Sequence, residues 1–298
     1  WDAALLTLLD IPAACLPEVC PSSTEFGYTK NEIFDSPILV GGIAGDQQAA
    51  LIGQACFKPG MAKSTYGTGC FLVLNTGEEI KYSNHQLLTT IAWKIGDKTM
   101  YAMEGSVFVG GAVIQWLRDG LELISASSEV EALCDSVQDT DGVYFVPALT
   151  GLGAPYWDSK ARGSIFGLTR GTSKAHLTRA AVESIAFQVN DLVKSMNKDL
   201  GTPIRALKVD GGASVNNFLM QFQADLIQAK VIRPKNHETT ALGAAYMAGL
   251  STGMWQNIDE IKQMWEEDRA FNPEQTEAEI APHLSGWEKA ISRTKNWL

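Results

Sequence analysis

The chain has 298 residues, of which 45% are hydrophobic and 19% charged, so it is long enough for one large folded domain or two ordinary ones. Its 24 Lys and Arg against 34 Asp and Glu give a formal net charge of -10, and no dense basic run is present. This composition disfavours a disordered chain, a nucleic-acid-binding protein and a protein attracted to anionic membranes. No apolar stretch is long enough for membrane insertion, and we expect a cytoplasmic protein.

The first 36 residues predict a short helix followed by irregular chain. Leu5, Leu6 and Leu9 are spaced for one face of a helix, which ends near Pro12. The prolines and serines that follow break any periodicity. We therefore expect residues 1–36 to be an entry segment and residues 37–298 to form one folded domain.

From residue 37 onwards, strand and helix patterns alternate. Strands are predicted at 38–40, 61–66, 71–74, 87–93, 99–103, 143–147, 204–209 and 231–232. Helices are predicted at 47–54, from Gly105 through Val109 to Leu117, from Ser127 towards Val137, at 173–199, 218–226 and 239–250, and in the amphipathic tail. The helix at 239–250 is rich in Ala and Gly, which would let it pack closely on a sheet. The order predicts one mixed α/β sheet with helices on its faces.

Three glycine-rich turns follow predicted strands, and each is a candidate ligand site. The first, Gly41–Gln48, places the carboxylate of Asp46 at the start of a helix. Because Asp is also a common helix cap, this residue alone does not distinguish capping from ligand binding. The neighbouring amides of Gln47 and Gln48 favour a ligand that carries hydroxyl groups.

The second and third turns have the features of a phosphate site and an adenosine site. Gly67-Thr68-Gly69 is either an ordinary hairpin turn or one whose glycines let a phosphate approach the backbone. Asp210–Ser214 is either a helix start capped by Ser214 or a turn that leaves room for adenine or ribose near Asn216. Since neither GxGxxG nor GxxxxGK[ST] occurs, a dinucleotide fold is disfavoured and a P-loop is excluded.

Taken together, the sequence resembles the FGGY carbohydrate kinases of the actin-like ATPase superfamily. The resemblance runs from about Trp1 to Leu298 and rests on GDQQAAL at 45–51, YGTGCF at 66–71, GLGAPYW at 151–157 and GSIFGL at 163–168. It implies an α/β fold, an actin-like ATPase or ribonuclease H-like domain with a mixed β-sheet flanked by helices. It also implies the C-terminal, nucleotide-binding domain of a kinase that transfers a phosphoryl group from ATP to glycerol.

The resemblance assigns roles to individual residues. Asp46 matches the catalytic base that accepts the proton of a glycerol hydroxyl, and it is also a candidate ligand of Mg²⁺. An ordinary aspartate pKa of about 4 suffices, because phosphoryl transfer needs the hydroxyl proton to leave only late. With Asp46, glycerol would be bound by Gln47 and Phe71. The residues that match nucleotide-binding positions, for ATP or ADP, are Thr68, Gly111, Gln115, Gly212 and Asn216.

Two parts of the family pattern do not occur in this chain. These are an Asp-Gln-Gly-Thr-Thr phosphate loop and an Arg-Glu pair that holds glycerol. The resemblance therefore implies that the chain is the C-terminal half of the enzyme and that residues 1–36 are a linker from the missing N-terminal domain. We expect the chain to need that domain as its partner, to be inactive alone and to form a homo-oligomer. The alternatives are a kinase for another polyol or ketose and a non-catalytic actin-like nucleotide-binding module. The run Asp46–Gln48 favours catalysis, because nucleotide binding alone does not require it.

Overall fold

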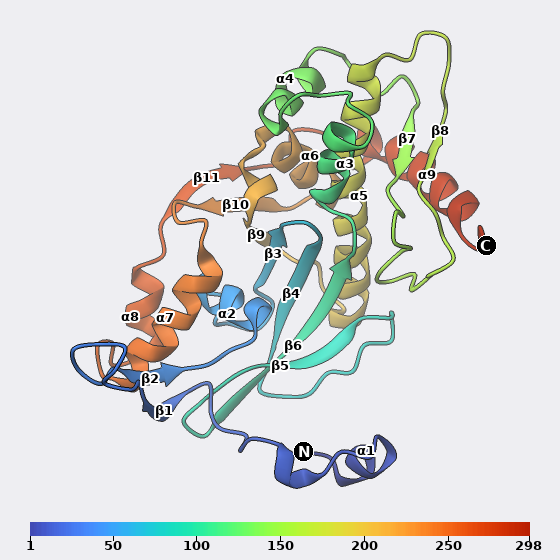
Figure 1. Cartoon of the computed structure of the whole chain (residues 1–298). Coiled ribbons are helices and arrows are strands. Elements are labelled where there is room, and N and C mark those ends of the chain that lie inside the picture. Colours follow the sequence, from blue (N-terminus) through green and yellow to red (C-terminus); the bar gives the residue numbers. More distant parts are fainter.

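The computed structural model describes residues 1–298, most of which surround one nine-stranded mixed sheet (Figure 1). The strand order is β11-β10-β9-β3-β4-β6-β5-β1-β2. The strands are β1 (Ser23–Tyr28), β2 (Leu39–Gly42), β3 (Ala62–Tyr66), β4 (Cys70–Gly77), β5 (Leu88–Ile95), β6 (Lys98–Val107), β9 (Ala206–Asp210), β10 (Lys230–Pro234) and β11 (Glu267–Phe271), with β7 (Tyr144–Val146) and β8 (Ser164–Phe166) as a separate antiparallel pair. The helices are α1 (Ala3–Leu8), α2 (Asp46–Gly53), α3 (Ala112–Asp119), α4 (Val130–Asp135), α5 (Lys174–Leu200), α6 (Asn217–Ile227), α7 (Thr239–Ser251), α8 (Ile258–Gln263) and α9 (Glu277–Thr294).

Helices cover both faces of the sheet. Strand β4 shows why this is needed, because its side chains alternate between the two faces. Leu72 and Leu74 enter the larger core with α5, whereas Val73 between them packs in a second core with α2 and α7. Helix α5 in turn packs against α3, α4 and α6. None of the helices has the length and apolar character needed to cross a bilayer.

Most of the predicted elements are confirmed, and three of them need correction. Strand β6 continues to Val107 and helix α3 begins only at Ala112, so Val109 lies in the connection between them. The helix predicted from Ser127 is a short 3₁₀ turn followed by α4. The tail contains a strand as well as helices, because β11 pairs with β10 at one edge of the sheet.

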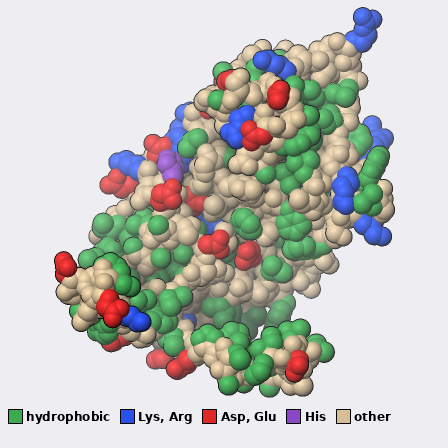
Figure 2. Space-filling model, viewed as in Figure 1, with side chains coloured by type: hydrophobic (Ala, Val, Ile, Leu, Met, Phe, Trp, Pro, Cys, Tyr) green, Lys and Arg blue, Asp and Glu red, His purple; other side chains and the backbone are tan.

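Strand β1 lies within the range predicted to be a linker, yet it is part of the sheet. It pairs with β2 and β5, and the Ser23 hydroxyl donates to the carbonyl of Met247 in α7 at 2.8 Å. The α1 segment differs, because none of its residues is buried. It extends away from the sheet in Figure 1, and hydrophobic atoms gather on this N-terminal part in Figure 2. The domain division at residue 36 stays a prediction. Strand β1, which precedes that boundary, is paired with the strands of the sheet.

The small-residue helix α7 packs on helix α2 as well as on the edge strand β2. A Cβ atom added to Gly243 would lie 1.8 Å from the carbonyl oxygen of Ala49, and one added to Gly53 would lie 1.9 Å from that of Thr239. The backbones of α2 and α7 therefore touch directly. This contact holds α2, whose first residue is Asp46, in its place over the sheet.

Gly243→Ala should lower the free energy of unfolding by about 2 kcal/mol, because the added methyl group forces the two helices apart. Alanine is intrinsically preferred in a helix by about 1 kcal/mol, so a loss has to come from packing. Urea denaturation of the chain measures it. Gly171→Ala is the control, since its added Cβ would meet no atom closer than 3.6 Å. Equal stability of the two variants would contradict the packing assignment.

Candidate active site

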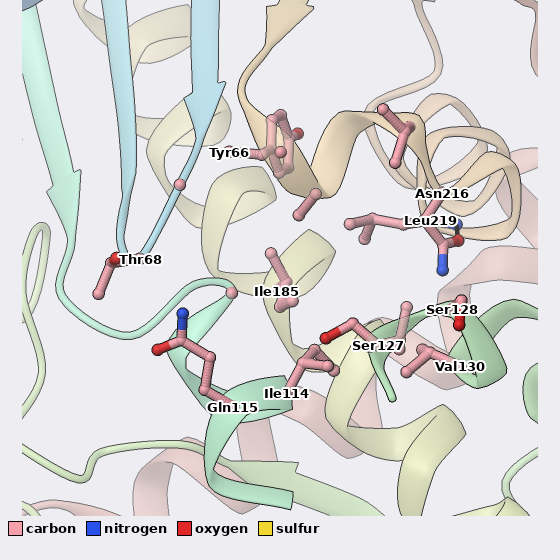
Figure 3. Close-up of a pocket in the computed structure, with 16 residues that line it drawn as sticks. Tyr66, Thr68, Ile114, Gln115, Ser127, Ser128, Val130, Ile185, Asn216 and Leu219 are labelled. Carbon is pink, nitrogen blue, oxygen red and sulfur yellow. Dashed lines mark hydrogen bonds between the residues drawn. The ribbon is translucent and has the colours of Figure 1, made fainter. Parts of the chain in front are cut away.

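A cavity of about 550 Å³ lies between the β3–β4 turn, α3 and the turn after β9. It is lined by all the residues predicted to bind nucleotide, namely Thr68, Gly111, Gln115, Gly212 and Asn216. In Figure 3, Thr68 and Gln115 lie at one end of the cavity, and Asn216 lies at the other end near Ser127 and Ser128. The sequence did not single out the serines or the apolar residues of the lining, which include Ile114, Val130, Ile185 and Leu219.

The Asn216 side chain has a structural role and still has free donors. Its Oδ1 accepts a hydrogen bond from the backbone N–H of Leu219 at 2.8 Å and so caps α6. The predicted cap, Ser214, instead donates to the carbonyl of Gly211 at 2.7 Å. Because the cap uses only the oxygen of the Asn216 amide, its NH₂ group stays available to a ligand in the cavity.

Of the two glycines after β9, the fold requires Gly211, whereas Gly212 leaves space for the cavity. Gly211 has a φ of +84°, and a Cβ on it would lie 2.7 Å from the carbonyl oxygen of Tyr66. The fold therefore needs glycine at this position. Gly212 has no such φ, and an added Cβ would meet no atom within 4 Å. The open space beside Gly212 belongs to the cavity.

The glycines before α3 are explained by the β3–β4 turn. The N–H groups of Gly110 and Ala112 both donate to the carbonyl of Thr68, at 2.8 and 3.1 Å, and Gly111 donates to Gly67 at 2.8 Å. A Cβ on Gly111 would lie 2.8 Å from that Gly67 oxygen. The turn is thus fastened to the start of α3. Gly111 lines the cavity, and its N–H group is already used by Gly67.

The residues predicted to bind glycerol lie outside the cavity, beside the same hairpin. Asp46 is the first residue of α2 and is exposed, and Gly45 is the helix cap, so the capping interpretation of Asp46 is wrong. The two carboxylate oxygens accept hydrogen bonds from Gln47, from its backbone N–H at 2.8 Å and from its side-chain Nε2 at 3.2 Å. Phe71 is half-buried on β4, three residues beyond Thr68. The β3–β4 hairpin therefore borders both groups of residues.

Lys63 of β3 contacts Gln47, and the sequence did not identify Lys63 as a site residue. Its side chain is fully buried. The ammonium donates to Oε1 of Gln47, to the hydroxyl of Thr65 at 2.9 Å and to the carbonyl of Phe71 at 3.4 Å. The available signal was a lysine in the middle of the strand predicted at 61–66.

Burial lowers the pKa of Lys63 to about 8, although Asp210, Glu104 and Asp46 oppose this shift by attracting the charged form. Burial also raises the pKa of Glu104, while Lys63 acts in the opposite direction. The strand register places Lys63, Val73 and Glu104 side by side in one row of β3, β4 and β6. A cation and a carboxylate thus lie in the sheet beneath α2.

Among residues 1–298, no three His, Cys, Asp or Glu side chains converge on a point where they could hold a metal ion. Asp46 is a single exposed carboxylate. Mg²⁺ in nucleotide sites is commonly held by one or two carboxylates, phosphate oxygens and water. Asp46 therefore fits an ion that arrives with nucleotide phosphates.

The family follows from comparison with known proteins. Residues 62–252 match the C-terminal domain of the FGGY family of carbohydrate kinases. The chain belongs to this family. Glycerol kinases from Dichelobacter nodosus and Parabacteroides distasonis are 55% and 57% identical to it over the whole chain. The chain spans about 60% of the length of these relatives.

Solved structures of FGGY kinases share the fold of the chain. Plasmodium falciparum glycerol kinase with ADP superimposes with a TM-score of 0.90 at 40% identity, over 99% of this chain and 59% of that one. A ligand-bound xylulose kinase from Lactobacillus acidophilus gives 0.81 at 25% identity, over 98% of this chain and 60% of that one. The predicted fold class is confirmed: an α/β domain of the actin-like ATPase type, with a large mixed sheet flanked by helices.

The stability of this FGGY domain should depend on pH because the ammonium of Lys63 is buried. Because the pKa of Lys63 falls from 10.5 to about 8 on folding, the folded chain binds fewer protons between these values. The contribution of Lys63 to stability therefore rises with pH through this window, by up to about 3 kcal/mol. Urea denaturation at pH 7 and pH 10 should show the native chain gaining stability relative to Lys63→Met. A difference independent of pH would contradict the shift.

Proposed function

We propose that this chain is the C-terminal, nucleotide-binding portion of an ATP-dependent glycerol kinase, with sn-glycerol 3-phosphate as product. The observation that carries the proposal is the β3–β4 hairpin, which has a cavity of nucleotide size on one side of its turn and the Asp46–Gln47 pair beside it. The proposal is supported by glycerol kinases that match the whole chain. Homo-oligomer formation and a cytoplasmic location stay predictions from the sequence.

In this proposal the cavity takes ATP, with adenosine at the end that holds Asn216. The missing side chain of Gly212 leaves room for the flat base, and the free NH₂ group of Asn216 donates to the nucleoside. The phosphates extend towards Thr68 and Gln115, whose hydroxyl and amide are donors suited to anionic oxygen atoms. The nucleotide thus ends at the turn that joins β3 to β4.

Glycerol binds at the start of α2. Each oxygen of the Asp46 carboxylate already accepts one hydrogen bond and has a lone pair left for a hydroxyl proton. Since the transition state of phosphoryl transfer is loose, an ordinary carboxylate is a sufficient base. Gln47 donates its second side-chain N–H to a glycerol oxygen, and Phe71 packs against the carbon chain. Bound Mg²⁺, held by phosphate oxygens with Asp46 as protein ligand, would neutralise phosphate charge.

The chain alone should be folded but inactive, because in-line transfer requires both reactants to be held at about 3 to 3.5 Å and half of the site is supplied elsewhere. The test compares the chain with a fusion that carries, in front of it, the part of the Dichelobacter nodosus relative that it does not match. With ATP, Mg²⁺ and glycerol, the fusion should release ADP at least about 10²-fold faster than the chain.

The acceptor panel for this assay includes xylulose and gluconate. Preference for glycerol supports the proposed function. Preference for xylulose or gluconate, or no transfer by a folded fusion, would overturn it. Equal turnover by the chain alone would contradict the division of the site between two domains.

Asp46→Asn in the fusion should lower kcat by about 10²-fold or more, because the amide cannot accept the hydroxyl proton. The melting temperature should change little, since Asp46 is exposed and is not the helix cap. Asp97→Asn is the matched control, because Asp97 is exposed in the β5–β6 turn. Near-native turnover of the Asp46 variant would rule out its assignment as the base.

Gly212→Val should weaken ADP binding to the chain by about 10- to 100-fold, because the branched side chain occupies the space proposed for the base. Stability should be preserved, since a Cβ at this position meets no protein atom within 4 Å. Isothermal titration calorimetry gives the affinity, with Gly171→Val as a control on an exposed loop outside the cavity. Native affinity of the Gly212 variant would place adenosine elsewhere.

A further inference from the structure

Lys63 is a buried cation without a close anion. Its strand β3 lies between β4 and β9, within the sheet, and its side chain has no exposed surface. The three acceptors of its ammonium, on Gln47, Thr65 and Phe71, are all uncharged oxygen atoms. No carboxylate lies within 4 Å of it, because Lys63 takes part in none of the ion pairs of the chain.

Such an arrangement is costly for folding. Removing an ammonium from water without an ionic partner is unfavourable, and a methionine of similar length would fill the same space at no such cost. The carboxylates that act on Lys63 from a greater distance are Asp46 on α2, Glu104 on β6 and Asp210 on β9. Two of these, Asp46 and Glu104, interact with each other as well as with Lys63. The buried charge of Lys63 therefore acts on the carboxylate of Asp46.

The contacts of Lys63 determine which way the amide of Gln47 faces. An ammonium group has only donors, so Gln47 has to present its oxygen to Lys63 and its NH₂ group to the carboxylate of Asp46. A reversed amide would oppose donor to donor at Lys63 and acceptor to acceptor at Asp46. Only one orientation of the Gln47 amide therefore satisfies the contacts with both Lys63 and Asp46.

We propose that Lys63 is a positioning residue for the phosphoryl acceptor, which fixes the amide of Gln47 and, through it, the carboxylate of Asp46. The proposal rests on the proposed function, since glycerol is taken as the ligand of these two side chains. Through the carbonyl of Phe71, Lys63 also ties this pair to the strand that carries the third glycerol-binding residue. It contributes nothing to the nucleotide cavity, whose lining does not include it.

A double-mutant cycle in the fusion tests this role. Lys63→Met should lower kcat/KM for glycerol by about 10- to 100-fold, the range for loss of a hydrogen bond to a charged group. The KM for ATP should stay within about twofold. In a Gln47→Leu background the same substitution should cost less than about threefold, because its effect passes through Gln47.

Lys208→Met is the matched control. Lys208 is the register partner of Lys63 on β9, and its ammonium contacts the carbonyl of Gln54 instead of Gln47. Lys208→Met should leave kcat/KM for glycerol within about threefold of the native value, because Lys208 lies outside the Lys63–Gln47 pair. The positioning role would be overturned if Lys63→Met lowered kcat/KM for glycerol equally in the native and Gln47→Leu backgrounds. It would also be overturned if the KM for ATP rose by the same factor by which kcat/KM for glycerol fell.

An assay-independent measurement separates this proposal from the proposed function. In ¹⁵N-labelled chain, the side-chain NH₂ signals of Gln47, identified by their loss in Gln47→Leu, should shift in Lys63→Met and not in Lys208→Met. Unchanged signals would overturn the positioning role even if the fusion phosphorylates glycerol. Shifted signals in a fusion that does not phosphorylate glycerol would leave the amide orientation supported and overturn only the proposed function.

Discussion

The carbonyl of Thr68 accepts two hydrogen bonds, from Gly110 and Ala112, and the candidate site depends on this attachment. It fixes the β3–β4 turn against the start of α3, so that Thr68 and Gln115 share one end of the cavity. Strand β9 pairs with β3 on the side opposite β4 and runs parallel to it. Gly211, directly after β9, lies so close to Tyr66 that an added Cβ would be 2.7 Å from the Tyr66 carbonyl oxygen. The cavity therefore forms where parallel strands end, the usual ligand position in an open α/β sheet.

The same hairpin borders the acceptor residues, and the α2–α7 contact determines where they lie. The close approach of these helices holds the start of α2 above β3, where Gln47 meets Lys63. In our proposal, the phosphoryl donor and the acceptor are held by opposite sides of the β3–β4 hairpin. Such an arrangement suits a reaction whose rate depends on positioning and on electrostatic stabilisation more than on covalent participation by the protein.

Much of this arrangement could be predicted from local sequence patterns. The GDQQAAL and YGTGCF motifs and the turn after β9 mark the elements that meet at the site, and hydrophobic periodicity located α5 closely. A lysine inside the predicted strand at 61–66 was a local signal, but its contact with Gln47 could not be predicted in this way. The two residues are 16 positions apart, and the bond forms only once α2 covers the sheet. Strands β1 and β11 were missed because their own sequences are weakly strand-like: both include charged residues, and β1 also includes Gly27. Pairing with β2 and β5 stabilises β1, and pairing with β10 stabilises β11.

A crystal structure of the fusion with ADP and glycerol tests most directly whether one hairpin holds both reactants. We predict ADP in the cavity with its phosphates beside Thr68 and Gln115, and a glycerol hydroxyl within hydrogen-bond distance of both Asp46 and Gln47. The two bonds from the start of α3 to the Thr68 carbonyl should persist. Nucleotide bound outside the cavity, or glycerol held without contact to Asp46, would contradict this arrangement.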